Sequence, residues 1–449
     1  MGAYRITGGA PLRGELDIVG GKNAVLPILA AAVLNAGVCV LRNCPRISDT
    51  HTAIVILRAV GCRAVFKGHE IQVDSAFADA VDVPEEPVRE MRAAIVFLGS
   101  LLGRFGKVRI GYPGGCALGA RPIDLHLKAL RQMGAEITEA NGFICAEAVK
   151  LRGARVHLDF PSVGATENIM LAAVLAEGET VICNAAREPE IVDLQGFLNA
   201  MGAKVRGAGT DTVVIQGLDG DMAALRSVEY TVMPDRIVAG TMLAAAAMTR
   251  GEVTLRGVVP GHLSSVLSRL TETGCVVREL DGEDGQGRLH LRAPEVIRPV
   301  DCIHTLPHPG FPTDMQAQFM AYLCLAQGTS VFIETVFESR NKHVAELRRM
   351  GADIVLSQDG QTSIIKGLGV GDGGDGTGLR RHQDGAPGRR ALRGAVVAAQ
   401  DLRGGAALVL AGLAAEGETV VMNTKHIERG YEAFDRDLAA LGAKIVFEE

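Results

Sequence analysis

Residues 129–138 read ALRQMGAEIT, an apolar helical stretch that ends at Gly134 and passes at once into a strand-like run. A phrase of the same shape occurs five more times along the chain. These copies are ILRAVGCRAV (56–65), FLNAMGAKVR (197–206), RLTETGCVVR (269–278), ELRRMGADIV (346–355) and DLAALGAKIV (437–446). Because glycine readily adopts the left-handed conformation that ends a helix, each copy predicts a helix, a glycine cap and a strand.

A second phrase lies between these copies and joins an Ala- and Leu-rich helix, a glycine and a strand. AAAVLNAGVCVL (30–41) and AGLAAEGETVVM (411–422) are its first and last occurrences. Its glycines are Gly37, Gly106, Gly178, Gly251, Gly328 and Gly417. Their spacing predicts six copies of about seventy residues, and we expect these glycines also to cap their helices.

The repeat predicts an α/β protein of two similar domains. A chain of 449 residues is too long for one hydrophobic core. One copy cannot bury all its apolar faces alone, so the copies must pack together, three to a domain. The turn-like YTVMPDR (230–236), between the third and fourth copies, is the expected boundary.

One interval between copies is lengthened by the Gly-rich segment 367–394. Its glycines at 369, 371 and 374 formally match the G-x-G-x-x-G pattern of nucleotide-binding loops. No helix pattern follows them, so no helix N-terminus is available for a pyrophosphate. We therefore expect a mobile surface insertion at about 367–391.

Composition and charge narrow the classes of function. The chain is 47% hydrophobic and 22% charged, and its net charge of -6 argues against a general affinity for nucleic acid. Nine cysteines without a C-x-x-C pair indicate reduced thiols in a cytoplasmic protein rather than disulfides or a zinc site. The apolar stretch Ala24–Leu41 carries Pro27, Asn35 and Gly37, which favours a buried helix and strand over a membrane span. No signal peptide is recognisable in residues 1–20.

Polar residues that do not recur in every copy are the candidates for a site. They lie in predicted loops: Gly20–Asn23, Met91–Arg92, Cys116 with Arg121 and Asp124, Ser162–Gly164, Phe311–Asp314, Ser339–Arg340, Asp401–Arg403 and His426–Arg429. Several isolated cations are what a small dianion requires, because guanidinium groups hold phosphate or carboxylate through paired hydrogen bonds. Any one of them by itself could equally be a solvated surface charge.

Cys116 differs in context from the other cysteines. It lies in GYPGGCALGARPIDLH (111–126), which is too rich in Gly and Pro for a helix or strand. Cys39, Cys62 and Cys324 instead fall in predicted strands, caps and helices, where packing explains them. A nearby cation such as Arg121 lowers a thiol pKa, so Cys116 is a candidate proton donor or nucleophile.

Six segments together resemble the UDP-N-acetylglucosamine 1-carboxyvinyltransferases, the enolpyruvyl transferases of the first committed step of peptidoglycan synthesis. They are GGKNAVLPILAA (20–31), PGGCALGARPIDLH (113–126), SVGATENIMLAA (162–173), NAAREPEIVD (184–193), FPTDMQAQF (311–319) and HIERGYE (426–432). The resemblance implies two inside-out α/β barrel-like domains, each of three βαβαββ-type copies, with substrates in the cleft between them. It implies domain limits of 22–229 and of 1–21 with 230–449, because the N-terminal strand of the family belongs to the second domain.

The resemblance also implies roles for individual residues. Cys116 would protonate the methylene of phosphoenolpyruvate from a closing loop and would be the thiol alkylated by fosfomycin-type epoxides, and Asp314 would accept the proton of the sugar 3-hydroxyl. Phosphoenolpyruvate would contact Lys22, Asn23, Arg121, Arg340, Arg403 and Arg429. UDP-N-acetylglucosamine would contact Asn23, Arg92, Arg121, Pro122, Ile123, Asp124, Leu125, Ser162, Val163, Gly164, Asp314 and Val336. Asp49 and Asp401 would support these groups, and no metal or other cofactor is implied.

Three departures from the family pattern affect the expectation. Gly404-Gly405 replaces a pair of small residues after Asp401-Leu402-Arg403 and should loosen the helix start by up to about 1 kcal/mol per glycine. Ser339 and Asn341 flank Arg340 where Asn and an aromatic residue are usual, and GGKN replaces GAKN. Two alternatives therefore stand beside the main reading: an inert paralogue that binds the nucleotide sugar, and the sister transferase that acts on shikimate 3-phosphate.

Overall fold

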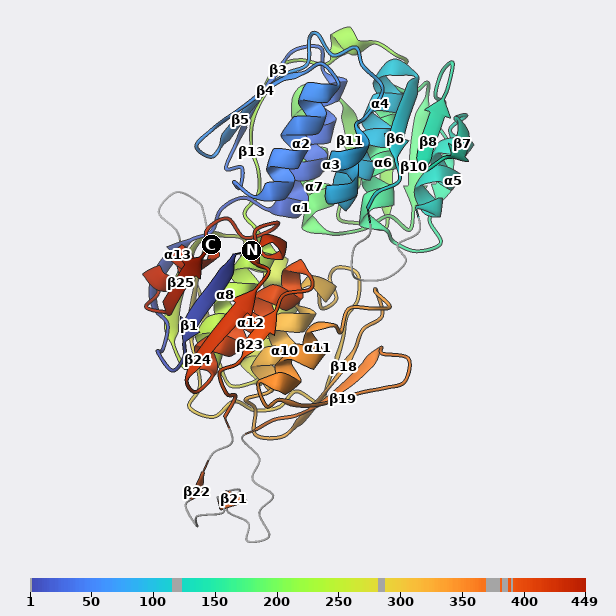
Figure 1. Cartoon of the computed structure of the whole chain (residues 1–449). Coiled ribbons are helices and arrows are strands. Elements are labelled where there is room, and N and C mark those ends of the chain that lie inside the picture. The colour runs from blue at the N-terminus through green and yellow to red at the C-terminus, as the bar shows by residue number, and fades with distance from the viewer. Residues whose placement is uncertain (1, 115–122, 282–286, 369–379, 382–386, 389–390) are drawn as a thin grey trace. The chain divides into compact units, whose positions relative to one another are not determined.

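The computed structural model describes residues 2–114, 123–281, 287–368, 380–381, 387–388 and 391–449. They form two compact units: a C-terminal unit of 2–18 with 236–449, and an N-terminal unit of 19–114 with 123–235 (Figure 1). Most of the predicted insertion at 367–391 lies outside the described residues; inside them, β21 (Arg380–Arg381) pairs with β22 (Pro387–Gly388). The predicted domain limits of 22–229 and of 1–21 with 230–449 remain our proposal.

The N-terminal unit contains three copies of the repeat. Its helices are α1 (Lys22–Ala31), α2 (Ser48–Ala59), α3 (Glu85–Glu90), α4 (Phe97–Phe105), α5 (Asp124–Gln132), α6 (Val163–Ala173) and α7 (Pro189–Met201), with short 3-10 helices η1 (Ala32–Leu34), η2 (Arg92–Val96) and η3 (Met222–Ala224). Its strands are β3 (Val38–Arg42), β4 (Arg63–Lys67), β5 (Glu70–Asp74), β6 (Lys107–Gly111), β7 (Glu136–Ala140), β8 (Phe143–Glu147), β9 (Arg155–His157), β10 (Glu179–Cys183), β11 (Lys204–Arg206), β12 (Thr212–Gln216) and β13 (Val228–Thr231).

The C-terminal unit contains the other three copies. Its helices are α8 (Arg236–Met248), α9 (Ser264–Glu272), α10 (Gln316–Leu323), α11 (His343–Arg349), α12 (Leu402–Ala414) and α13 (Phe434–Ala440), with η4 (Pro260–Leu263), η5 (Thr313–Met315) and η6 (Thr424–His426). Its strands are β1 (Ala3–Thr7), β2 (Arg13–Asp17), β14 (Glu252–Val258), β15 (Val276–Leu280), β16 (Gly287–Arg292), β17 (Cys302–His304), β18 (Thr329–Ile333), β19 (Asp353–Leu356), β20 (Thr362–Lys366), β23 (Val396–Ala398), β24 (Glu418–Met422) and β25 (Lys444–Glu448).

The six copies share one sheet pattern. In each of the five four-stranded sheets a linking strand runs parallel to the first strand of a copy. In four of these sheets the two strands of a hairpin complete the sheet in reverse order, and in the fifth β1 and β25 take these two places. These sheets are β13-β3-β5-β4, β9-β10-β12-β11, β2-β14-β16-β15, β17-β18-β20-β19 and β23-β24-β1-β25. The sheet of the remaining copy, β6-β8-β7, has three strands, and a single parallel bridge between Asp82 and Arg109 takes the place of its linking strand. The βαβαββ prediction is thereby confirmed, although no sheet of the described residues closes into a barrel.

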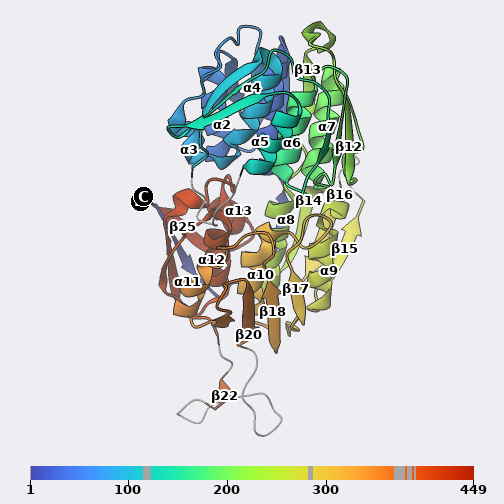
Figure 2. The same cartoon turned by 90° about the vertical axis from the view of Figure 1, so that its right-hand side faces the viewer.

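The helices that are buried on all sides lie inside, and the sheets and the amphipathic helices lie around them. In the C-terminal unit α8, α10 and α12 pack side by side with strands around them (Figures 1 and 2). Every residue of α8 after Arg236 is buried, whereas the outer helix α9 buries only Val266, Leu267 and Leu270. A helix that is apolar on all sides belongs in a core, and an amphipathic one covers it, so the two repeated phrases supply the inner and outer helices.

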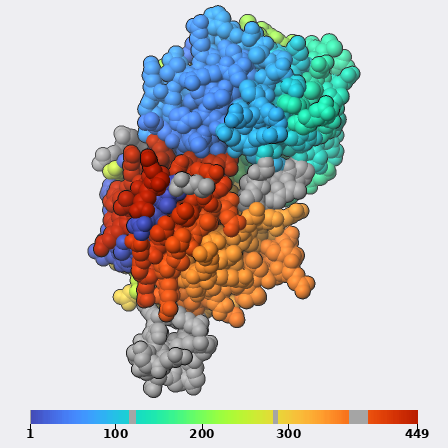
Figure 3. Space-filling model, in the orientation of Figure 1, coloured from blue at the N-terminus to red at the C-terminus, as the bar shows by residue number. Residues whose placement is uncertain are grey.

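The chain closes the sixth copy with its own beginning. Strand β1 pairs with both β24 and β25, so residues 3–7 complete a sheet whose other strands come from 396–448. The space-filling view shows the blue N-terminal residues embedded among the red C-terminal ones (Figure 3). Residues 2–18 therefore fold with the C-terminal unit.

The glycine caps are as predicted in the first phrase but not in the second. All six glycines of the first phrase have positive φ, between 92° and 114°, and the strand begins two residues later in every copy. Of the six glycines of the second phrase, Gly106 alone caps its helix. Helices α6, α10 and α12 end at the C-caps Val174, Cys324 and Ala415, before Gly178, Gly328 and Gly417. Gly37 and Gly251 lack a positive φ, so the prediction is wrong at these five positions. A Cβ at Gly251 would lie 2.0 Å from the carbonyl oxygen of Leu12, and the left-handed residue is Arg250 instead. Close approach of another chain segment, rather than a cap, accounts for glycine at this position.

The apolar stretch Ala24–Leu41 forms α1, η1 and β3, as the sequence predicts. Among the described residues, no helix combines the length and apolar character needed to span a membrane.

Candidate active site

Four of the described candidate residues lie at or just before the starts of inner helices. Lys22 is the first residue of α1, Arg92 opens η2 ahead of α4, and Ser162 is the N-cap of α6. Asp401 is the N-cap of α12, where its carboxylate accepts hydrogen bonds from the backbone N–H groups of Arg403 and Gly404. The first turn of a helix carries a partial positive charge and free N–H groups, which favour anions.

In the C-terminal unit Asp314 is held by two buried arginines. The Nη2 atom of Arg340 lies 2.7 Å from Oδ1 of Asp314, and Nη2 of Arg403 lies 3.2 Å from Oδ2. Both arginine side chains are at most 3% exposed, whereas Asp314 is 26% exposed. Charge-assisted bonds from two sides fix the carboxylate and leave it accessible to solvent.

Aromatic rings and a buried glutamate support this group. The guanidinium of Arg340 lies 5.1 Å from the ring centre of Phe337, within the range of a cation–π contact. Glu334, which is 1% exposed, accepts hydrogen bonds from Thr313 Oγ1 and from the backbone N–H of Val336. Glu334 thus ties Val336 to the residue before Asp314. Sequence reasoning missed Glu334 because its partner Thr313 lies 21 positions away and meets it only in the folded chain.

The departures around Arg340 leave this arrangement intact. Asn341 accepts from Gln316 Nε2 at 2.6 Å and donates to the carbonyl oxygen of Gly360 at 2.6 Å. These bonds fasten the segment to the start of α10. His343 is 2% exposed, and burial lowers its pKa, with Asp401 opposing and Arg340 reinforcing the shift. A neutral imidazole adds no charge beside the arginines.

The two glycines of α12 fit a crowded place. A Cβ at Gly404 would lie 2.8 Å from Oδ2 of Asp401, and one at Gly405 would lie 2.8 Å from both Ala399 Cβ and Ile427 Cγ1. The helix begins at Leu402 nonetheless, capped by Asp401. The expected loosening of the helix start is opposed by this close packing.

In the N-terminal unit Lys22 is buried against an acid. Its Nζ lies 2.7 Å from Oδ2 of Asp49, and its backbone N–H donates to Oδ2 of Asp235 at 3.1 Å. Asn23, next along α1, is half-buried. The structure therefore joins Lys22 and Asp49, both of which are predicted site residues.

A buried histidine lies behind the predicted nucleotide-sugar segment. Nδ1 of His126 lies 2.7 Å from Nδ2 of Asn168, whose Oδ1 accepts from the backbone N–H of Gly99. The amide nitrogen therefore donates, and the imidazole carries its proton on Nε2. Burial, reinforced by Arg92, lowers the pKa of His126 to about 4. A Cβ on Gly164 would lie 3.1 Å from Cε1 of His126, which brings the start of α6 against this ring.

The remaining predicted residues are placed as follows. Ile123 is buried, Asp124 is exposed, and Leu125, Ser162, Val163, Gly164, Arg92 and Arg429 are half-buried. Cys116, Arg121 and Pro122 lie outside the described residues. Cys39, Cys62 and Cys324 are buried, and burial raises their thiol pKa values to about 11, 11 and 12. The packing explanation of these three thiols is confirmed.

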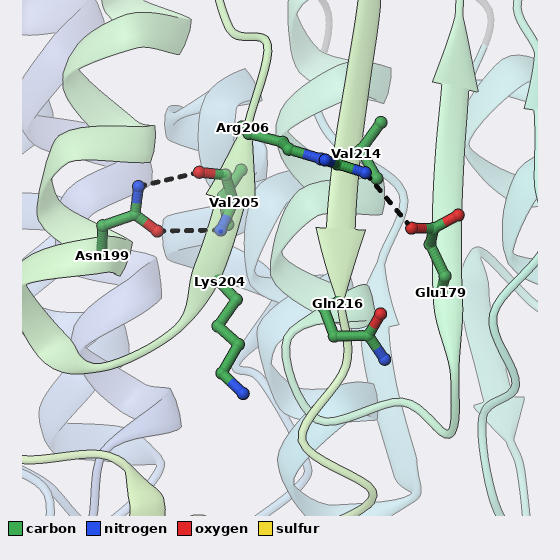
Figure 4. Close-up of a pocket in the computed structure, with 7 residues that line it drawn as sticks. All are labelled: Glu179, Asn199, Lys204, Val205, Arg206, Val214 and Gln216. Atoms are coloured by element: carbon green, nitrogen blue, oxygen red, sulfur yellow. Dashed lines mark hydrogen bonds and ion pairs between the residues drawn. The ribbon is translucent and has the colours of Figure 1, made fainter.

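A separate depression lies on the outer sheet of the N-terminal unit. Its lining includes Asn199, Lys204, Arg206 and Glu179 (Figure 4). Nη2 of Arg206 lies 3.5 Å from Oε2 of Glu179. It contains none of the predicted site residues.

Comparison with known proteins agrees with the fold. Residues 6–438 match the family described as EPSP synthase (3-phosphoshikimate 1-carboxyvinyltransferase). UDP-N-acetylglucosamine 1-carboxyvinyltransferase 2 of Caldanaerobacter subterraneus subsp. tengcongensis is 48% identical over 446 residues, 99% of each chain. UDP-N-acetylglucosamine 1-carboxyvinyltransferase 1 of Carboxydothermus hydrogenoformans is 47% identical over 445 residues, 99% of this chain and 98% of the relative.

Two solved structures share the architecture. The enolpyruvyl transferase NikO from Streptomyces tendae superposes with a TM-score of 0.84 at 24% identity, over 99% of this chain and 98% of NikO. EPSP synthase from Acinetobacter baumannii superposes with a TM-score of 0.74 at 20% identity, over all of both chains. At these identities the likeness supports the fold.

Proposed function

The chain belongs to the family of UDP-N-acetylglucosamine 1-carboxyvinyltransferases, and we propose on that basis that it transfers the enolpyruvyl group of phosphoenolpyruvate to the 3-hydroxyl of UDP-N-acetylglucosamine. Phosphate is the second product. The observation that carries this proposal is the 48% identity to a relative of that name over 99% of the chain. The protein is an enzyme, a transferase of peptidoglycan synthesis.

The geometry of Asp314 suits the first proton transfer. A base must be ionised before it accepts a proton, and two guanidinium groups on one carboxylate favour the ionised form. Asp314 then takes the proton of the sugar 3-hydroxyl while the sugar oxygen bonds to C2 of phosphoenolpyruvate. Cys116 delivers a proton to the methylene carbon, which becomes a methyl group.

Elimination completes the reaction. The bond from C2 to the phosphate oxygen breaks, and the methyl group returns one proton to the Cys116 thiolate. The enol ether forms, and the proton that Asp314 accepted leaves with the released phosphate. Positive charge develops at C2 beside a phosphate and a carboxylate, so fixed cations are needed to hold both anions. The proposed contacts of phosphoenolpyruvate are Lys22, Asn23, Arg121, Arg340, Arg403 and Arg429. Asp49 orients Lys22, and Asp401 orients the start of α12.

The nucleotide sugar is proposed to contact Asn23, Arg92, residues 121–125, Ser162, Val163, Gly164, Asp314 and Val336. The half-buried start of α6, with the N–H groups of its first turn, suits a diphosphate. We further propose that the protein acts in the cytoplasm, supports cell growth and division through the cell wall, and is alkylated at Cys116 by fosfomycin.

Phosphate release tests the proposal. The full-length protein is incubated with phosphoenolpyruvate and either UDP-N-acetylglucosamine, shikimate 3-phosphate or no acceptor. We expect release with the nucleotide sugar alone. Release only with shikimate 3-phosphate would assign the sister activity, and sugar binding without release would indicate an inert paralogue.

A further inference from the structure

A buried polar network links α8, α10 and the segment after η6 in the C-terminal unit, behind Asp314 and Arg403. Its members are Thr241 on α8, Gln318 on α10 and Tyr431, which follows η6. Thr241 and Gln318 are fully buried and Tyr431 is 3% exposed. Three adjacent polar groups in a core are costly unless each is hydrogen-bonded, so their arrangement calls for a reason.

The directions of the hydrogen bonds follow from the available hydrogens. Thr241 Oγ1 donates its hydrogen to the carbonyl oxygen of Ile237 at 2.7 Å. Its contact with the Tyr431 hydroxyl, at 2.9 Å, must therefore use the tyrosine hydrogen. The Tyr431 hydroxyl is a donor with a fixed direction, which sets the orientation of its ring.

Gln318 connects this pair to the site. Its Nε2 donates to Thr241 Oγ1 at 3.0 Å and to the backbone carbonyl of Asp314 at 2.9 Å, with the Tyr431 hydroxyl at 3.3 Å. The opposite amide orientation would set the glutamine oxygen against the Asp314 carbonyl, so the donor assignment is the one that the surroundings permit.

The network returns to Arg403 through the ring of Tyr431. The guanidinium of Arg403 lies 5.3 Å from the ring centre, and Phe434 packs on Tyr431 with ring centres 4.5 Å apart. Arg403 in turn bonds the Asp314 carboxylate. A closed path thus runs from the Asp314 backbone through Gln318, Thr241, Tyr431 and Arg403 to the Asp314 side chain.

We propose that Thr241, Gln318 and Tyr431 are positioning residues of the transferase, which set the angle between Arg403 and the Asp314 carboxylate. This inference rests on the proposed function of Asp314 and Arg403. They act on the site by fixing the backbone carbonyl of Asp314 and the aromatic face that Arg403 contacts. Misplacement of a reacting group by about 1 Å costs up to roughly a hundredfold in rate.

The test compares two tyrosine-to-phenylalanine variants of the full-length protein. Tyr431→Phe removes the donated hydrogen and keeps the ring. Tyr322→Phe is the matched control, because Tyr322 is also fully buried in this unit and its hydroxyl bonds Thr273 Oγ1 at 2.8 Å. We expect Tyr431→Phe to lower kcat by about tenfold or more with little change in KM for the nucleotide sugar, and Tyr322→Phe to leave kcat within about twofold.

A double-mutant cycle separates positioning from general packing. In an Arg403→Lys background, the further change Tyr431→Phe should lower kcat by less than about twofold, because the group that Tyr431 positions is already lost. The inference is wrong if Tyr431→Phe and Tyr322→Phe behave alike, or if Tyr431→Phe costs the same factor in both backgrounds. Wild-type phosphate release in the same assay reports on the proposed function itself. The same cycle on phosphoenolpyruvate binding, measured by calorimetry, tests the inference without turnover.

Discussion

The ammonium group of Lys22 lies 2.7 Å from Oδ2 of Asp49, and these side chains are only 10% and 5% exposed. Taking a cation and an anion out of water costs several kcal/mol per ion, and their close contact offsets much of that cost. The pair therefore holds a positive charge at the start of α1 at a defined place.

Removing the acid should affect both stability and substrate binding. We expect Asp49→Asn to destabilise the N-terminal unit by about 3 kcal/mol and to weaken phosphoenolpyruvate binding, because the Lys22 ammonium loses its ionic partner. Asp82→Asn is the control, since Asp82 is 70% exposed and lies 3.8 Å from Arg109; it should cost less than about 1 kcal/mol. Thermal unfolding and calorimetric titration measure the two effects. Equal losses in both variants would contradict the assignment.

Arg403 should not tolerate replacement by another cation. Arg403→Lys keeps the charge but loses the planar fork that reaches Asp314 and the stacking on Tyr431. We expect kcat/KM for phosphoenolpyruvate to fall about a hundredfold, a loss of about 2.7 kcal/mol. Arg256→Lys, which alters an exposed arginine paired with Asp17 at 2.7 Å, should leave the rate near wild type. Steady-state phosphate release decides; a rate unaffected by Arg403→Lys would remove Arg403 from the site.

Cys116 should be the thiol that an epoxide labels. Burial raises the thiol pKa values of Cys44 and Cys324 to about 12, so neither forms a nucleophile near neutral pH. We expect mass spectrometry to find one adduct per chain after treatment with fosfomycin and none in Cys116→Ser. Labelling that persists in the variant would identify another cysteine as the target.

Gly405 should resist replacement by alanine. Alanine favours helix by about 1 kcal/mol over glycine, but its Cβ would meet Ala399 and Ile427 at 2.8 Å. We expect Gly405→Ala to lower the melting temperature, with a net cost of about 1 to 2 kcal/mol. Gly261→Ala, at a position where a Cβ would meet nothing within 4 Å, should be neutral or stabilising. A raised melting temperature for Gly405→Ala would contradict this prediction, because it would show that the side chains around α12 move to accept the added Cβ.

His126 predicts a specific acid sensitivity. The folded protein holds the pKa of His126 at about 4, below the ordinary 6.5. The unfolded chain therefore binds this proton first, and stability falls as the pH drops from about 6.5 to about 4. At pH 5 the loss is about 2 kcal/mol relative to pH 8.

The comparison must use a variant, because other groups act in the opposite direction. Burial raises the pKa values of Asp193 and Asp437 to about 6, which favours folding at lower pH. His126→Leu leaves those acids in place, so the variant should lose about 2 kcal/mol less than wild type between pH 8 and pH 5. His304→Leu, at an exposed position, should follow wild type. Calorimetric melting at both pH values measures this, and parallel curves for His126→Leu and wild type would refute it.

The fold could be predicted because the repeat carries it six times. Gly134 and its five counterparts each mark the end of a helix and the start of a strand. Because the pattern recurs six times, a single glycine present by chance could not produce a wrong fold prediction. Gly251 shows the limit of such reasoning. Its contact with Leu12 joins segments 239 positions apart, and nothing in the local sequence distinguishes close approach from a helix cap.

The candidate site could be predicted only in part. Asp314 and Arg403 stand out as polar residues that the repeat does not require. Gln318, Thr241 and Tyr431 lie among apolar residues, and the sequence does not show which partners their side chains contact. Their partners come from three different copies, so the network exists only once those copies pack. Asn168 and Glu334 escaped notice for the same reason.

The pairing of β1 with β24 and β25 has a consequence during synthesis on the ribosome. Residues 19–235 are continuous, so the N-terminal unit can fold while the rest of the chain is still being made. Strand β1 is translated before the N-terminal unit, whereas its partners at 418–422 and 444–448 are translated after it. The nascent chain must therefore keep this five-residue segment unpaired until both partner strands have been made, and a tag fused ahead of Ala3 would show whether this late pairing tolerates an added segment.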